Sequence, residues 1–274
     1  MVTWDLPQNM MSATVELVQR QIDGTSTAGT GFLVNDPGPD GRPRTVLVTA
    51  AHVFDRMQLS QVQIGYRVQT KDGGWRYAPQ MVNIRDLGKT LWRSDQAHDV
   101  AAIEVQAPPE FAKAAIPLSW LAGDDAFAKD GVGPGDEMMV LGYPQGLAAD
   151  TAGFPILRSG RVASPIEAAK ANPTFLLDFR VFPGNSGGPV FLAEPDRDNP
   201  GSPPVQFIAG MLTEQVELDN ERLEIGVVTD AQFIRDTIAL LDKPASAQPA
   251  AAAVPAATPT STDASATIGV ATTD

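Results

Sequence analysis

The chain has 274 residues, of which 43% are hydrophobic, and its formal net charge is −13. This length suffices for one large domain or for two small ones that share an interface. The negative charge repels phosphate backbones, which argues against nucleic acid as the main partner, and the sequence has no run of about 18 apolar residues that would predict membrane insertion.

The chain contains no cysteine and only two histidines, His52 and His98. Disulfides, thiolate catalysis and cysteine-bound metal are therefore excluded, and a zinc site built from several histidines is not expected. The N-terminal stretch "MVTWDLPQNMMSATVELV" lacks a basic region followed by an apolar stretch, so no signal peptide is predicted. A cytoplasmic location is favoured, and a periplasmic or secreted one stays open if a leader has been removed.

Short segments rich in Val, Ile, Leu, Phe and Tyr alternate with clusters of Gly, Pro, Asp and Asn along most of the chain. Such segments are typical of strands joined by turns, and they predict an all-β barrel or sandwich. In chain order the predicted strands are residues 29–34, 45–50, 61–69, 99–105, 137–143, 156–163, 175–181, 188–193, 205–212 and 223–228.

One long helix is predicted over residues 229–243. Thr229 is its expected cap, Gln232 completes a capping box, and Pro244 ends the helix. Its apolar face is formed by Ile234, Ile238 and Leu241. The following residues 244–274 are almost entirely Ala, Pro, Thr and Ser, which predicts a disordered tail, with a partner-binding tail as the alternative.

The stretch "PGNSGGPV", residues 183–190, exposes Ser186 among small glycines. A serine nucleophile needs a base, a group that orients the base, and donors for the oxyanion. The stretch also matches the G-x-S-x-G elbow of α/β-hydrolases, whose histidine follows the serine, but no histidine follows Ser186. The subtilisin order needs an aspartate before His52, and none of the early aspartates stands at the end of a strand. The remaining order is His52, Asp99, Ser186, as in chymotrypsin.

His52 follows the apolar segment "TVLVTA", where a purely structural histidine is the alternative interpretation. Asp99 opens the segment "VAAIEV" and is the candidate orienter, with a turn residue or cap as its alternative. His98 is interpreted as a residue at the rim of the site.

The blocks "TAAHV", "HDVAAIEV" and "GNSGGPV", in this order, resemble the three catalytic blocks of trypsin/chymotrypsin-like serine peptidases, most of all those of the bacterial HtrA/Deg-like branch. The likeness covers about residues 12–241 and includes "GTGFLV" and "VLGYPQG". The resemblance implies that Ser186 is the nucleophile, His52 the general base and then acid, and Asp99 the orienter. The backbone N–H groups of Gly184 and Ser186 would form the oxyanion hole.

The resemblance also implies two six-stranded antiparallel Greek-key β-barrels with a C-terminal helix. Residues 1–117 would carry the His and the Asp, and residues 118–243 would carry the Ser and the closing helix. Asn185 replaces the aspartate that binds a newly cut N-terminus in zymogen-activated relatives, so activation by cleavage is not expected. Because only the low-complexity tail follows Leu241, no PDZ domain is expected either.

The expected function is a serine endopeptidase that cleaves peptides or unfolded proteins through an acyl-enzyme, without a cofactor or metal. The alternatives are a catalytically silent peptide-binding or scaffold module and an esterase-like hydrolase on the same fold. Arg180 could form the floor of the specificity pocket and favour an acidic P1 residue. The favoured alternative turns Arg180 to solvent and leaves a small apolar pocket of Val181, Ala209 and Met211. P1 preference and oligomeric state stay open.

Overall fold

The structure is a computed structural model, and it describes residues 6–169, 171–194, 204–218 and 221–243. The predicted tail, residues 244–274, lies outside the described residues. The chain up to Pro244 clusters as one compact unit that contains both predicted barrels. A division of this unit near residue 117 therefore stays a prediction.

The strands of the first half are β1 (Thr14–Arg20), β2 (Ser26–Asp36), β3 (Arg44–Ala50), β4 (Gln61–Ile64), β5 (Arg67–Gln69), β6 (Trp75–Tyr77), β7 (Gln80–Asn83), β8 (Arg85–Asp86), β9 (Lys89–Thr90), β10 (Arg93–Asp95), β11 (Val100–Glu104) and β12 (Ile116–Pro117). Those of the second half are β13 (Glu137–Gly142), β14 (Ile156–Val162), β15 (Thr174–Asp178), β16 (Pro189–Glu194), β17 (Val205–Leu218) and β18 (Glu221–Asp230).

The helices are α1 (Leu6–Ala13), α2 (Ala51–Arg56), α3 (Pro109–Ala114), α4 (Ala126–Lys129) and α5 (Ala231–Ala239), with 3₁₀ turns η1 (Leu118–Trp120), η2 (Pro144–Gly146) and η3 (Leu240–Asp242). None of these described helices has the length and apolar character that crossing a membrane requires. The expected all-β class with a C-terminal helix is confirmed.

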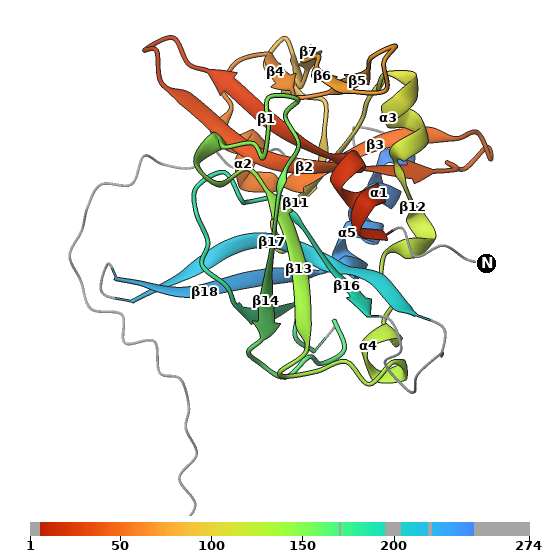
Figure 1. Ribbon diagram of the computed structural model, residues 1–274, viewed down its shortest axis with the longest axis vertical. Helices are drawn as coiled ribbons and strands as arrows, with labels where there is room; N and C mark the ends of the chain where they lie inside the picture. The colour runs from red at the N-terminus through yellow and green to blue at the C-terminus, as the bar shows by residue number, and fades with distance from the viewer. Residues whose placement is uncertain (1–5, 170, 195–203, 219–220, 244–274) are drawn as a thin grey trace, which may run out of the picture. The chain divides into compact units, whose positions relative to one another are not determined.

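The second half closes into a six-stranded antiparallel barrel in the order β13-β14-β15-β18-β17-β16, as predicted. The first half differs from the prediction. Its main sheet has the order β10-β11-β3-β2-β1-β4-β7, with β12 added parallel to β2, and this order does not close over the described residues. The outer strands β10 and β7 have only three and four residues, and the chain beside them pairs separately as β5–β6 and β8–β9. In Figure 1 the sheet occupies the upper part and the barrel strands the lower part.

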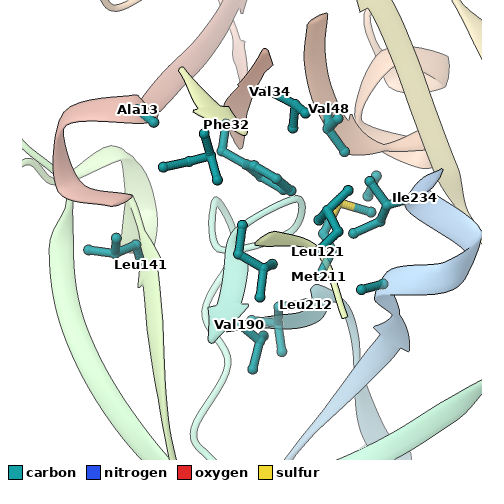
Figure 2. Close-up of a cluster of buried hydrophobic side chains, with 14 of the residues drawn as sticks. Ala13, Phe32, Val34, Val48, Leu121, Leu141, Val190, Met211, Leu212 and Ile234 are labelled. Carbon is teal, nitrogen blue, oxygen red and sulfur yellow. The ribbon is translucent and has the colours of Figure 1, made fainter. Parts of the chain in front are cut away.

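One continuous apolar core runs through both halves. Figure 2 shows side chains from the sheet, the barrel and α5 meeting in a single cluster. Full burial of each large apolar side chain contributes about 1.5–3 kcal/mol, so this cluster fixes the two halves against each other. The buried side chains labelled there include Phe32, Val34 and Val48 from the sheet, Leu141, Val190, Met211 and Leu212 from the barrel, and Ile234 from α5.

The predicted cap of the C-terminal helix is wrong by one residue. Thr229 belongs to β18, where it pairs with Thr174 of β15, and its hydroxyl donates to the His98 carbonyl at 3.0 Å. Asp230 caps α5 instead, because its Oδ1 accepts the Gln232 N–H at 2.7 Å. Since aspartate caps a helix as well as threonine does, the sheet takes Thr229 at no cost to the helix.

The buried Asp230 cap predicts a pH dependence of stability. Burial raises the pKa of Asp230 from 3.8 to about 6, although the hydrogen bond from Gln232 opposes that rise. Because the pKa of Asp230 is higher in the folded than in the unfolded protein, its contribution to stability is fully present below the unfolded pKa. This contribution is lost as the pH rises through about 6. We expect Asp230→Asn, which still caps, to exceed the wild type in unfolding free energy by about 1–3 kcal/mol at pH 7.

Urea unfolding at pH 4, 5, 6 and 7 measures this difference. Asp236→Asn on the same helix, at an exposed position, is the matched control and should follow the wild-type pH profile. Parallel profiles for Asp230→Asn and the wild type would contradict the prediction.

Candidate active site

His52 and Asp99 are brought together by the pairing of β3 with β11. Val100 lies opposite Ala50, so Asp99 precedes one paired residue and His52 follows the other by two positions. The Asp99 Oδ2 atom lies 2.6 Å from His52 Nδ1, and its Oδ1 accepts the His52 backbone N–H at 2.8 Å. The carboxylate therefore contacts both the ring and the backbone of the same histidine.

Asp99 also accepts a hydrogen bond from the first residue of α2, the helix that carries His52. Ala50, at the N-cap position of α2, makes no side-chain capping bond, and the Asp99 carbonyl accepts the Ala51 N–H at 3.1 Å. Asp99 reaches this position with φ +56°, in the left-handed region that aspartate tolerates better than most residues. An ionised carboxylate only accepts hydrogen bonds, so Nδ1 of His52 is the donor in this contact, and in the neutral imidazole of that tautomer the lone pair is on Nε2.

The turn that carries Ser186 is seated against the strands leading to His52. The Ser186 carbonyl accepts the Thr30 N–H at 2.9 Å, and the Gly187 N–H donates to the Leu212 carbonyl at 2.8 Å. Gly187 has φ +87°, and a Cβ there would lie 2.0 Å from the Thr30 carbonyl oxygen and 3.1 Å from the Ala50 nitrogen. Only glycine permits this approach, so the serine turn lies beside the residues that precede His52.

The residues before Ser186 form a turn with a defined orientation. The Asn185 N–H donates to the Phe182 carbonyl at 3.0 Å, with Pro183 second and Gly184, at φ +94°, third in the turn. This is the signature of a type II turn. Among the described residues, no partner accepts a hydrogen bond from the N–H of Gly184 or of Ser186. These are the two donors predicted for the oxyanion hole.

The side chain of Asn185 is 2% exposed, and its Nδ2 has no partner among the described residues. A neutral amide without a partner is less costly to bury than an unpaired carboxylate. The position therefore suits Asn better than the Asp of zymogen-activated relatives, in which an N-terminal amine supplies the counter-charge.

His98 forms a second aspartate–histidine pair. Its Nδ1 lies 2.6 Å from Asp95 Oδ2, and its ring stacks on Phe233 of α5 with centroids 3.6 Å apart. These contacts, together with the Thr229 bond to its carbonyl, fix the residue directly before Asp99.

A further carboxylate, Asp55, lies on α2 one turn after His52. Burial raises the pKa of Asp55, while the hydrogen bond from Gln96 and the positive charge of Arg85 oppose that rise. The nearby Asp99 charge also raises the pKa of Asp55, and His52 lowers it, so Asp55 interacts electrostatically with both residues. Within the described ranges, no group of three or more His, Asp or Glu side chains could hold a metal ion.

The residues predicted to form the specificity pocket differ in exposure. The Arg180 side chain is 61% exposed and pairs with Glu224, with its Nε 3.1 Å from Oε1. Val181 is buried near Gly226, where an added Cβ would lie 3.3 Å from its Cγ2. Ala209 and Met211 are fully buried, and Figure 2 shows Met211 within the core cluster.

Two residues that the sequence analysis did not single out contact the serine turn directly. The Thr30 hydroxyl donates to the Gly184 carbonyl at 2.6 Å. The Gln145 N–H donates to the Pro183 carbonyl at 2.6 Å. Their only sequence signals are their places in "GTGFLV" and "VLGYPQG".

The fold resembles that of solved proteases. Two structures of the HtrA-type protease AlgW with tripeptide, one of them a variant, match with TM-scores of 0.52 and 0.51, each at 16% identity. They cover 88% and 86% of this chain, which spans only 64% and 63% of theirs. The active form of the Rv3671c protease from M. tuberculosis matches with a TM-score of 0.48 and 19% identity, over 86% of this chain and 83% of that one. At these identities the likeness concerns the fold.

No curated protein matches the chain. The family model of the trypsin-like peptidase domain matches residues 29–195. This span includes His52, Asp99, Ser186 and the barrel strands β13 to β16, but not β17 and β18. This match covers more than half of the chain, and it agrees with the closed barrel and the paired histidine and aspartate. The chain therefore belongs to the trypsin-like peptidase family.

Proposed function

We propose that the protein is a serine endopeptidase whose catalytic residues are Ser186, His52 and Asp99. The observation that carries the proposal is the 2.6 Å contact between Asp99 Oδ2 and His52 Nδ1. It leaves Nε2 as the free base of the imidazole, and the turn that carries Ser186 packs against Ala50, two residues before His52. Membership of a peptidase family supports a peptide bond as the target.

In the proposed reaction, His52 Nε2 takes the Ser186 proton while Oγ attacks the carbonyl carbon of the peptide bond. The N–H groups of Gly184 and Ser186 stabilise the oxyanion of the tetrahedral intermediate. The imidazolium then gives its proton to the leaving amine, and the C–N bond breaks. Water, deprotonated by His52, attacks the resulting ester, and the Ser186 hydroxyl is restored.

Labelling with a fluorophosphonate tests the nucleophile and the base. We expect the wild type to be labelled at Ser186, and Ser186→Ala and His52→Ala to be unlabelled. His98→Ala is the matched control for the loss of a histidine and should retain labelling. A folded wild type that takes no label would contradict the proposal and favour a scaffold role.

Digestion of an unfolded protein, with cleavage sites mapped by mass spectrometry, tests the substrate class. We expect internal peptide bonds to be cut, and the residues before them report the P1 preference. Hydrolysis of model esters without any cut in the unfolded protein would instead identify an esterase.

A further inference from the structure

The turn from Pro183 to Ser186 is held from two sides by residues outside the catalytic group. Gln145 binds the Pro183 carbonyl, and Thr30 binds the Gly184 carbonyl, both at 2.6 Å. These two carbonyls belong to successive peptide units on either side of Gly184. Their directions decide where the N–H groups of the turn point.

The bond from Gln145 sets the direction of the Gly184 N–H. A trans peptide is planar, so its C=O and N–H point in opposite directions. With the Pro183 carbonyl directed at Gln145, the Gly184 N–H points away from it and stays without a partner among the described residues. In a type I turn this peptide would be rotated by about 180°, and the donor would be lost.

Gln145 donates this bond from a conformation that needs support. Its φ and ψ are 55° and 26°, which is the left-handed region and unusual for glutamine. The Gly146 N–H bond to the Tyr143 carbonyl at 2.9 Å and the Leu147 N–H bond to the Pro144 carbonyl at 3.0 Å fix the residues around it. Strain held by its surroundings in this way is typical of functional segments.

Thr30 links the serine turn to the segment that carries Gln145. Its fully buried hydroxyl donates to the Gly184 carbonyl and accepts the Tyr143 N–H at 3.2 Å, while its own N–H donates to the Ser186 carbonyl. Thr49 in turn donates to the Thr30 carbonyl at 2.7 Å. One residue of β2 therefore contacts the serine turn twice and the segment that carries Gln145 once.

We propose that Thr30 and Gln145 are positioning residues that hold the turn in its type II form, with the Gly184 and Ser186 donors directed at the developing oxyanion. This proposal rests on the proposed peptidase activity. Neither residue touches the substrate, and both act through the backbone of the turn.

Thr30→Val keeps the shape of the side chain and removes its hydroxyl, while Thr30→Ser keeps the hydroxyl. We expect Thr30→Val to lower kcat about 10²-fold with little change in KM, because the loss of one oxyanion donor has this size. Thr30→Ser should recover most of the wild-type kcat. Gln145→Pro, which has no N–H to donate, should lower kcat similarly, and Gln145→Asn, which keeps the N–H and tolerates the left-handed region, should not.

A peptide aldehyde and a cleaved product peptide separate this role from a general loss of structure. The aldehyde forms an oxyanion on Ser186, so its affinity should fall about as much as kcat/KM in Thr30→Val. The product peptide forms none, so its affinity should not change. Thermal unfolding confirms that each variant is folded.

Wild-type activity with an unchanged kcat in both Thr30→Val and Gln145→Pro would overturn this proposal and leave the proposed function intact. An equal loss of affinity for aldehyde and product would also overturn it, because that result indicates general damage to the site. An inactive wild type would contradict the proposed function itself.

Discussion

Asp99→Asn is expected to lower kcat about 10⁴-fold, the scale on which the orienting aspartate acts in a serine triad. The asparagine oxygen can still accept the His52 backbone N–H that Asp99 Oδ1 accepts at 2.8 Å, so α2 keeps its start. The amide NH₂ then faces Nδ1 and forces the proton onto Nε2. The imidazole can no longer accept the Ser186 proton, although the geometry of the site is retained. Steady-state hydrolysis of a peptide substrate, with a thermal melt of each variant, measures this effect.

The chain offers a matched control in its second aspartate–histidine pair. Asp95 lies 2.6 Å from His98 Nδ1, the same distance as Asp99 from His52. Asp95→Asn should leave kcat within about threefold of the wild type, because this half-buried pair takes no part in the proposed reaction. If both variants lost activity equally, or if Asp99→Asn stayed active, the orienter would be assigned wrongly.

Arg67→Met is expected to lower the free energy of unfolding by about 3–5 kcal/mol, as when one partner of a buried charged network is removed. The Arg67 side chain is fully buried in β5. It donates to the Tyr143 hydroxyl at 3.1 Å and to the Gly153 carbonyl at 2.7 Å. It also donates to the carbonyls of Met11, Ser12 and Thr14. Methionine fills the space but leaves these acceptors without a donor.

The rings of Phe111 and Phe154 lie 4.9 and 4.5 Å from the Arg67 Cζ atom, and the charge of Asp150 also acts on the guanidinium. Urea unfolding at neutral pH measures the effect. Arg85→Met is the control, because Arg85 also binds carbonyls and lies over a ring but is only partly buried. Its loss should cost about 1 kcal/mol. A cost for Arg67→Met no larger than for Arg85→Met would refute the prediction.

Strands whose side chains are mostly buried were predicted best from the sequence. The apolar segments 45–50 and 188–193 correspond closely to β3 and β16, because continuous burial leaves few polar letters in the chain. Strand β1 (Thr14–Arg20) was missed, because buried and half-buried positions alternate along it and polar letters interrupt its apolar pattern. The first barrel was predicted too simply, because strand order and closure depend on pairings between distant segments, such as β1 with β4.

In the candidate site too, some residues could be predicted from the sequence and others could not. His52, Asp99 and Ser186 were accessible to sequence reasoning because their chemistry restricts which residue types can serve and the chain has only two histidines. Thr30 was not, because a threonine between two glycines has many ordinary roles. Gln145 acts through its backbone N–H, which every residue except proline has, so the identity of its side chain does not indicate this role. The sequence does not show which face of β17 points to the core, so the full burial of Met211 could not be predicted from it.

The continuous core that joins the sheet to the barrel has a consequence for the lifetime of the protein. A chain proposed to cut unfolded substrates is itself a substrate whenever a segment opens. Because the two halves share one set of buried side chains, neither can open far without the other, and exposure of the backbone within this described core follows global unfolding. Resistance to self-digestion is thus linked to the same packing that joins the sheet with His52 to the barrel with Ser186.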